Sequence, residues 1–222
     1  PRVQGLQPAA ASRRFPSYLA PAMTQLPELP LTLSRQEIRK MIRQRRRALT
    51  PEQQQEMGQQ AATRMMTYPP VVMAHTVAVF LSFDGELDTQ PLIEQLWRAG
   101  KRVYLPVLHP FSAGNLLFLN YHPQSELVMN RLKIHEPKLD VRDVLPLSRL
   151  DVLITPLVAF DEYGQRLGMG GGFYDRTLQN WQRYQMQPVG YAHDCQLVEK
   201  LPVEEWDIPL PAVVTPSKVW EW

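Results

Sequence analysis

Four of the chain's eleven glycines stand in one short stretch, RLGMGGGFYDR, from Arg166 to Arg176. Consecutive glycines can adopt positive φ, and they can turn several backbone N–H groups into one concave surface that binds oxyanions. A helix is expected to start at Phe173, and its N-terminus would add the positive end of a dipole. The stretch is therefore a candidate phosphate site, and a tight turn that binds nothing is the alternative.

The spacing of this loop differs from the two common nucleotide motifs. A Walker A loop requires a lysine and a hydroxyl residue where Gly-Phe-Tyr stands, and the dinucleotide pattern G-x-G-x-x-G does not fit either. Asp175 still points to phosphate, because a carboxylate beside an anion site repels the ligand unless a cation lies between them. Magnesium binds in this way, through one or two carboxylates and nucleotide oxygens. A charge that complements the helix dipole is the alternative role for Asp175.

Positive charge is concentrated near the N-terminus. Residues 1–50 contain ten Lys/Arg and two Asp/Glu, so this part carries +8 and the remainder −6. Ser34 and Glu37 have capping-box spacing, and the apolar residues of RQEIRKMIRQRRRAL recur with helical spacing, which predicts a helix from Arg35 to Leu49. Its arginines form a basic stripe that indicates a polyanionic ligand. A nucleic-acid-binding module that uses RQRRR is an alternative, although no aromatic residues are interleaved with these arginines.

Helices and strands alternate along the rest of the chain. The patterns predict helices at 51–66, 88–100 and 173–184, and strands at 76–83, 101–108, 116–121, 151–160, 188–193 and 212–216. This alternation predicts an α/β fold, a three-layer sandwich with a mostly parallel sheet. The proline-rich stretch 122–148 is expected to consist of connections. The glycine loop follows the strongest predicted strand, and ligands in such folds sit outside the carboxyl ends of the strands.

Composition sets the limits of the domain. Residues 1–30 are rich in proline and alanine and predict a disordered leader or an arm added by cloning, and 31–222 would then form a single domain. The single cysteine, Cys195, cannot form an internal disulfide, and we expect it to be buried and inert. No apolar run approaches the roughly 20 residues that span a bilayer. These features predict a soluble, cytoplasmic protein with no membrane partner.

The glycine stretch, preceded by PLVAFDEYG at 156–164, resembles the R-L-G-x-G-x-G-[YF]-Y-D signature of the 5-formyltetrahydrofolate cyclo-ligases, also called 5,10-methenyltetrahydrofolate synthetases. The resemblance extends from Arg35 to about Thr215. It implies a fold akin to the sugar-phosphate isomerase and CoA-transferase group. It also implies an enzyme that uses ATP and Mg²⁺ to close 5-formyltetrahydrofolate into 5,10-methenyltetrahydrofolate. ADP and phosphate would be released, through a phosphorylated formyl group, an iminophosphate.

The resemblance assigns roles residue by residue. The implied ATP-binding positions are Arg35, Arg39, Arg166, Leu167, Gly168, Met169, Gly170, Gly171, Gly172, Phe173 and Tyr174. The implied folate-binding positions are Arg39, Leu81, Glu86, Phe173 and Tyr174, with Glu86 hydrogen-bonded to the pterin. Asp175 and Asp207 are the implied magnesium ligands, and no covalent nucleophile is expected.

The chain departs from the family pattern at three of these positions. Arg35 replaces a lysine, which keeps the charge but exchanges a point cation for a planar fork. Met169 and Gly171 stand where some members carry Arg and Lys, so Arg166, Arg176 and the basic helix are left to hold the triphosphate. A sugar-phosphate isomerase or transferase of the same fold group is the second enzymatic alternative. The partners expected are small-molecule substrates, and we expect a monomer.

Overall fold

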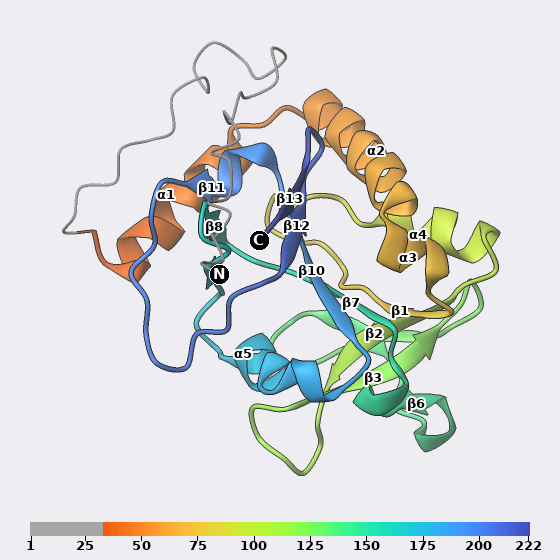
Figure 1. Cartoon of the computed structure of the whole chain (residues 1–222). Coiled ribbons are helices and arrows are strands. Elements are labelled where there is room, and N and C mark those ends of the chain that lie inside the picture. Colours follow the sequence, from red (N-terminus) through yellow and green to blue (C-terminus); the bar gives the residue numbers. More distant parts are fainter. Residues whose placement is uncertain (1–32) are drawn as a thin grey trace, which may run out of the picture.

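The computed structural model describes residues 33–222, so the predicted leader lies outside the described residues (Figure 1). The main sheet contains eight strands: β1 (Thr76–Ala78), β2 (Arg102–Leu108), β3 (Leu116–Tyr121), β6 (Val144–Leu145), β7 (Val152–Thr155), β10 (Gln187–Tyr191), β12 (Ala212–Val214) and β13 (Val219–Glu221). They lie in the order β13-β12-β10-β7-β1-β2-β3-β6. The run from β12 to β2 is parallel, and β13, β3 and β6 join at the edges in antiparallel orientation. The predicted α/β fold with a mostly parallel sheet is confirmed.

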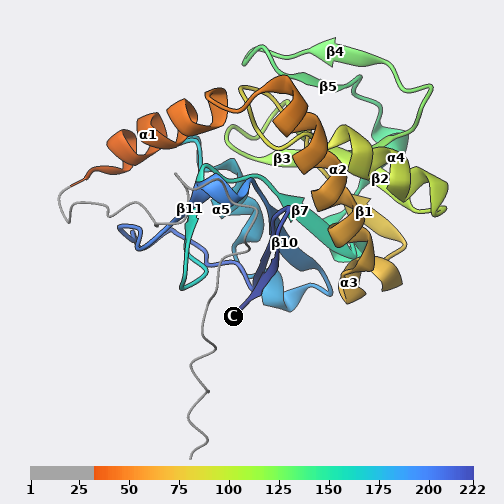
Figure 2. The ribbon, with the colours of Figure 1, turned by 90° about the horizontal axis from the view of Figure 1, so that it is seen from above.

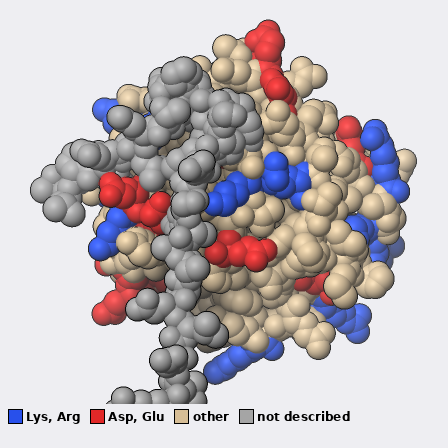
Figure 3. Space-filling view, turned by 45° about the horizontal axis from the view of Figure 1, so that its top comes forward, with Lys and Arg blue, Asp and Glu red and all other residues tan. Residues whose placement is uncertain are grey.

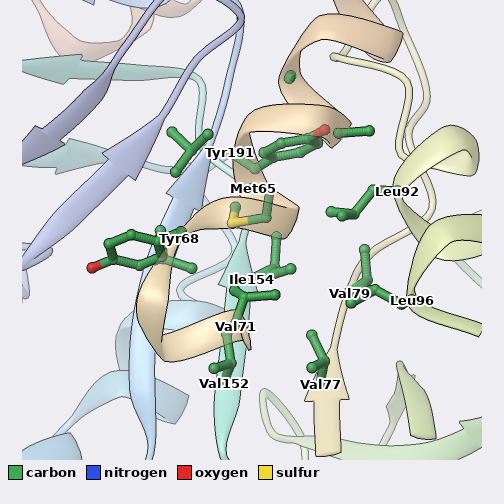
Figure 4. Close-up of a cluster of buried hydrophobic side chains, with 14 of the residues drawn as sticks. Met65, Tyr68, Val71, Val77, Val79, Leu92, Leu96, Val152, Ile154 and Tyr191 are labelled. Atoms are coloured by element: carbon green, nitrogen blue, oxygen red, sulfur yellow. The ribbon is translucent and has the colours of Figure 1, made fainter. Parts of the chain in front are cut away.

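Helices cover both faces of this sheet. The helices α2 (Pro51–Thr67), α3 (Pro69–Met73) and α4 (Gln90–Arg98) lie on one face, and α5 (Phe173–Leu178) lies on the other (Figure 1). Figure 4 shows Met65 and Leu96 from the helices facing Val77 and Ile154 from the strands. Full burial of each such side chain contributes about 1.5–3 kcal/mol. This apolar layer fixes the sheet whose strand ends carry the site.

The helix α1 (Arg35–Arg47) packs away from the main sheet. Its apolar stripe, with Ile38 and Ile42, is buried against a small sheet of β8 (Ala159–Asp161), β9 (Arg166–Leu167) and β11 (Leu197–Val198). Figure 2 shows α1 and β11 side by side along one flank of the molecule. The helix begins at the predicted cap, because the Ser34 hydroxyl accepts the Glu37 N–H at 3.1 Å. Its polar face is therefore free to meet the glycine loop.

Several predicted elements have different limits. The predicted strand 151–160 is two strands, β7 and β8, because the chain leaves the main sheet at 156–158 to enter the small one. The strand predicted at 76–83 ends at Ala78, and the helix predicted at 173–184 ends at Leu178. Asn180 then adopts positive φ (59°) before a 3-10 turn, η4 (Trp181–Arg183). Val79 still bonds the Tyr104 carbonyl at 2.9 Å, and Phe80, Leu81 and Phe83 then line the site.

The stretch 122–148, expected to be connections, contains ordered elements. It holds the hairpin β4 (Leu127–Met129) and β5 (His135–Pro137), the strand β6 and the 3-10 turns η2 (Val141–Asp143) and η3 (Leu147–Arg149). A further turn, η5 (Asp194–Gln196), follows β10. Figure 2 shows the β4–β5 hairpin at the rim of the molecule. Over residues 33–222, none of the helices combines the length and apolarity that crossing a membrane would require.

Candidate active site

The candidate site lies where β1, β7 and β10 end. These neighbouring parallel strands end at Ala78, Thr155 and Tyr191, so the segments that follow them emerge along the same edge of the sheet. Ligands in open α/β folds bind outside this edge. The glycine loop, residues 168–172, meets the site from β9 and leads into α5.

Three guanidinium groups surround the glycine loop. Arg39 donates from Nε to the Gly168 carbonyl at 2.7 Å, and the Arg166 guanidinium lies beside Gly168. Arg176 donates from Nη2 to the Gly171 carbonyl and from Nε to the Gly114 carbonyl, both at 2.5 Å. Positive charge therefore reaches the loop from α1, β9 and α5, although the loop itself contains no basic residue.

The backbone of the loop requires its glycines. Gly170 and Gly172 have φ of 108° and 71°, which side chains other than glycine rarely adopt. A Cβ added to Gly171 would lie 2.8 Å from the Phe173 ring. A lysine at position 171 would therefore require the Phe173 ring to shift. Leu167 packs under α1, so it can reach a nucleotide only through its backbone.

The two predicted magnesium ligands lie near each other. Asp207 is bonded in two places to Arg35, at 2.6 and 3.0 Å, and also accepts the Glu204 N–H at 2.8 Å. Asp175 lies 3.5 Å from Arg166. Burial raises the pKa of Asp175, Arg166 lowers it, and the negative charge of Asp207 raises it. Two carboxylates that repel each other are a suitable pair for a cation.

This pair fits magnesium only together with substrate oxygens. Across residues 33–222, His, Cys, Asp and Glu side chains do not converge in threes on a possible metal position. Magnesium usually takes one or two carboxylates and completes its coordination with phosphates and water. Asp175 and Asp207 satisfy that requirement, and Asp207 would have to exchange part of its Arg35 pairing for the metal.

A cavity of about 420 Å³ opens next to the glycine loop. It brings together Leu81 and Glu86 from the segment after β1 with Met169, Gly171, Phe173 and Tyr174 from the loop and α5. The other lining residues are apolar side chains and the hairpin: Phe80, Phe83, Leu105, Pro106, Leu108, Leu116, Asn130, Leu132, Ile134, His135, Glu136 and Pro156. A cavity with apolar walls and few polar groups suits a flat aromatic ligand.

Glu86 is presented by a tight turn. Asp84 and Gly85 both have positive φ (52° and 76°), and the Glu86 N–H bonds the Phe83 carbonyl at 3.1 Å. The Phe83 N–H in turn donates to Glu86 Oε1 at 3.1 Å. Burial raises the pKa of Glu86 to about 7. The Phe83 hydrogen bond and the positive charges of Arg46 and Arg166 lower this pKa, but they offset only part of the effect of burial. Glu86 can therefore change its charge near neutral pH.

The C-terminal half of α1 binds this turn. Asp84 accepts Arg47 Nη2 at 2.7 Å and lies 3.8 Å from Arg46 and 4.0 Å from Arg43. The Gly85 carbonyl bonds Gln54 and His193, each at 3.1 Å. The arginines of α1 thus serve different places. Arg39 contacts the glycine loop and Arg35 pairs with Asp207. Arg43, Arg46 and Arg47 lie against Asp84 in the Glu86 turn.

These contacts also bear on the nucleic-acid alternative. The arginines of the RQRRR run that face Asp84 are committed within the molecule, and Arg46 is buried. On the face drawn in Figure 3, blue and red side chains are scattered among tan ones, and the residues shown in colour there form no continuous basic patch. The arginines of α1 are therefore better explained by their contacts with the glycine loop and the Glu86 turn than by nucleic-acid binding.

The hairpin wall of the cavity was missed by sequence reasoning. Glu136 Oε2 accepts the Leu108 N–H and the Asn130 side-chain amide, each at 3.0 Å, so it ties the β4–β5 hairpin to the end of β2. Asn130 Oδ1 also accepts the N–H groups of Leu132 and Ile134, which shapes the hairpin tip. Short strands without clear alternation gave no signal. The apolar triplet Leu127–Met129 followed by an Asn-x-x-x-Ile turn was the available cue.

No side chain here has the character of an activated nucleophile. Cys195 is buried, as predicted, and burial raises its pKa to about 12, which disfavours the reactive thiolate. Burial likewise raises the pKa of the Tyr174 phenol. The arrangement can hold an oxyanion, a cation between two carboxylates and an apolar ring system side by side. That suits a reaction governed by alignment and charge stabilisation.

Comparison with known proteins gives one family. The sequence matches the model of the 5-formyltetrahydrofolate cyclo-ligase family over residues 32–216, which includes α1, the glycine loop and both aspartates. It is 98% identical over 182 residues to the 5-formyltetrahydrofolate cyclo-ligase of Escherichia coli K12, which covers 82% of this chain and all of that protein. It is 53% identical over 179 residues to the enzyme of that name from Haemophilus influenzae, covering 81% of this chain and 96% of the other.

A solved structure agrees with this assignment. The 5,10-methenyltetrahydrofolate synthetase of Aquifex aeolicus superposes with a TM-score of 0.73 at 28% identity, covering 85% of this chain and 93% of the other. The synthetase from Mycoplasma pneumoniae shares the fold, with a TM-score of 0.66 at 22% identity. The family match, the sequence identities and the shared fold together show that the chain belongs to the 5-formyltetrahydrofolate cyclo-ligase family of enzymes.

Proposed function

We propose that the protein closes 5-formyltetrahydrofolate into 5,10-methenyltetrahydrofolate at the expense of ATP, with Mg²⁺ bound and with release of ADP and phosphate. One observation carries this proposal. A glycine loop surrounded by three guanidinium groups borders, through Gly171, Phe173 and Tyr174, a cavity that contains Glu86. A phosphoryl donor and a folate bound in these two places would meet at the loop.

The nucleotide is assigned to the loop side. Backbone N–H groups of 168–172, together with Arg35, Arg39 and Arg166, would hold the triphosphate. Asp175 and Asp207 would hold Mg²⁺ with the phosphate oxygens. When bound, the ion supplies positive charge that neutralises the β- and γ-phosphate oxygens. Arg35, which is paired with Asp207 in this structure, would be freed to contact the phosphates if that carboxylate held the metal.

The folate is assigned to the cavity. The pterin ring carries adjacent N–H donors, and the Glu86 carboxylate offers the matching acceptors at its end of the cavity. Leu81, Phe173 and Tyr174 would contact the ring faces, and Arg39 would stand at the junction with the nucleotide. This placement directs the formyl group toward the glycine loop.

The chemistry follows from the poor leaving ability of a formamide oxygen. The formyl oxygen attacks the γ-phosphorus, the bond from that phosphorus to the β-γ bridging oxygen breaks, and ADP leaves. N10 then adds to the activated carbon and loses its proton, and the formyl oxygen departs with the phosphate. The chain's own residues orient the two substrates and stabilise the spreading phosphoryl charge, so no covalent intermediate with the protein is needed.

The fate of the formyl oxygen tests this sequence of steps. With substrate labelled by ¹⁸O in the formyl group, we expect the label in the inorganic phosphate released, one per turnover. Unlabelled phosphate alongside methenyl product would contradict the phosphorylated intermediate. A cytoplasmic location, a monomeric state, a single domain over 31–222 and kinship with the sugar-phosphate isomerase group stay predictions.

A further inference from the structure

Arg46 is a buried arginine beside the turn that carries Glu86. It stands in the last turn of α1 with only 4% of its surface exposed, and its Nε has no hydrogen-bond partner among the described residues. Leaving a buried guanidinium nitrogen unpaired is costly, and arginines are almost never fully buried unless paired. A function that needs a cation at this point would explain why the cost is tolerated.

The Arg46 side chain is built into the turn that carries Glu86. A Cβ added to Gly85 would lie 3.2 Å from Arg46 Cβ, and Gly85 has a φ of 76°, so the turn packs closely against the helix and favours glycine here. Arg46 Nη2 lies 3.8 Å from Asp84 Oδ2, on the other side of the same turn. The charge on Arg46 acts on Glu86 in the direction that lowers its pKa.

The other groups facing Glu86 do not replace this charge. Asp84, in the same turn, is negative, and Tyr174 from α5 is an uncharged phenol. His193, after β10, is neutral at pH 7 because burial lowers its pKa to about 4. Arg166 from β9 is positive, but it is engaged by the Pro156 carbonyl at 2.8 Å and by Asp175. Arg46 is therefore the cation available to Glu86 from the α1 side.

We propose that Arg46 is a positioning residue of the folate site: its buried guanidinium holds the Asp84–Gly85 turn and keeps the Glu86 carboxylate anionic, so that Glu86 accepts hydrogen bonds from the pterin. This inference rests on the proposed function, since it concerns the folate-binding residue of that reaction. It assigns a role to the basic stripe that is independent of the nucleotide.

The test is the pH profile of kcat/KM for 5-formyltetrahydrofolate at saturating Mg-ATP. Removing the charge in Arg46→Met raises the Glu86 pKa, so the acid limb of the profile is expected to move to higher pH by about one unit. The KM for ATP should stay unchanged. Arg46→Lys keeps the charge and should keep the limb within about 0.3 unit of wild type.

Arg45→Met is the matched control. Arg45 precedes Arg46 in α1, and its replacement by Met removes the same positive charge. Its Nη2 contacts Met41 Sδ, and it does not face Glu86. The acid limb of the profile should therefore stay in place. An unmoved limb in Arg46→Met, or an equal shift in Arg45→Met, would overturn the proposal. If Arg46→Met fails to fold, Arg46→Gln takes its place. An acid limb that moves to higher pH in Arg46→Gln but not in Arg46→Lys supports the proposal, and acid limbs at the same pH in both variants reject it. Absence of turnover in the wild-type protein would instead reject the proposed function.

Discussion

At the scale of single residues, the site is a set of charges held in positions that folding alone would not favour. Asp175 and Asp207 repel each other, and burial raises the pKa of Glu86 to about 7. Ionisable groups with such shifts gather at functional sites, because burial and like charges are what a ligand of opposite character relieves. The carboxylates are thus better explained by their ligands than by the stability of the fold.

Substitution of Asp175 separates these two explanations. Asp175→Asn removes the charge but keeps the shape, so we expect the Mg²⁺ concentration for half-maximal rate to rise at least about tenfold, because a charged ligand is lost. The melting temperature should change by no more than about 2 °C, since one repulsion and one ion pair disappear together. Magnesium titration of the rate, with a thermal melt of each protein, measures both. Unchanged activity would return Asp175 to the role of a charge at the helix end.

At the scale of elements, α1 and the glycine loop organise the two proposed substrate positions. One face of α1 packs on the small sheet. Arg39, in the first half of the helix, contacts the glycine loop, and Arg47, at its C-terminal end, contacts the Glu86 turn. The loop is held on its other side by Arg176, which also bonds Gly114 and lies 5.5 Å from the Phe173 ring. The glycine loop and the cavity are therefore positioned by the same few contacts.

Arg176 gives a prediction for this scale. Arg176→Ala frees the Gly171 and Gly114 carbonyls and removes a cation, so the KM for ATP should rise about tenfold or more. Arg176→Lys should recover only part of this, because an ammonium cannot repeat the two-point contact. Steady-state kinetics with varied ATP measure the effect, and Arg183→Ala, an exposed arginine of η4, is the control. Equal ATP KM values in wild type and Arg176→Ala would show that the loop holds its shape without the clamp.

Local patterns were enough to predict the longer helices and strands, and several of the features that were missed depend on long-range contacts. The cap at Ser34, the start of a helix at Pro51 and the strand at Leu116–Tyr121 each depend on neighbours in sequence, and all were predicted. The division of 151–160 into two strands depends on which sheet each half joins. The roles of Arg46 and Glu136 depend on contacts with residues 38 and 28 positions away, which no local pattern contains.

At the scale of the whole molecule, the site costs stability. The Glu86 pKa is about 7 in the folded protein and about 4.5 in the unfolded chain. Protonated Glu86 therefore contributes to the free energy of unfolding in full below pH 4.5. This contribution is lost as pH rises through 7, because the unfolded chain releases the Glu86 proton at lower pH than the folded protein does. His193 acts in the opposite sense, because its pKa of about 4 in the folded protein destabilises the fold as pH falls below 6.5.

The raised pKa of Glu86 predicts that removing its charge makes the folded protein more stable while folate binding is lost. Glu86→Gln cannot ionise, so at pH 8 its free energy of unfolding should exceed that of wild type by about 1–2 kcal/mol, a rise of a few degrees in melting temperature. At pH 5 the two proteins should melt together. The kcat/KM for folate should fall by about 10- to 100-fold at pH 8, because a charged acceptor is lost. Thermal melts at both pH values decide the matter, and a Glu86→Gln protein less stable than wild type at pH 8 would refute this account of Glu86.

The most direct measurement of the central claim is a single optical assay. Protein, Mg²⁺, ATP and 5-formyltetrahydrofolate are mixed, and the absorbance of 5,10-methenyltetrahydrofolate is followed. We expect product to form with one ADP per turnover, and we expect none when ATP is omitted or Mg²⁺ is chelated. Product formation without ATP, or a folded protein that forms none in the complete mixture, would contradict the account.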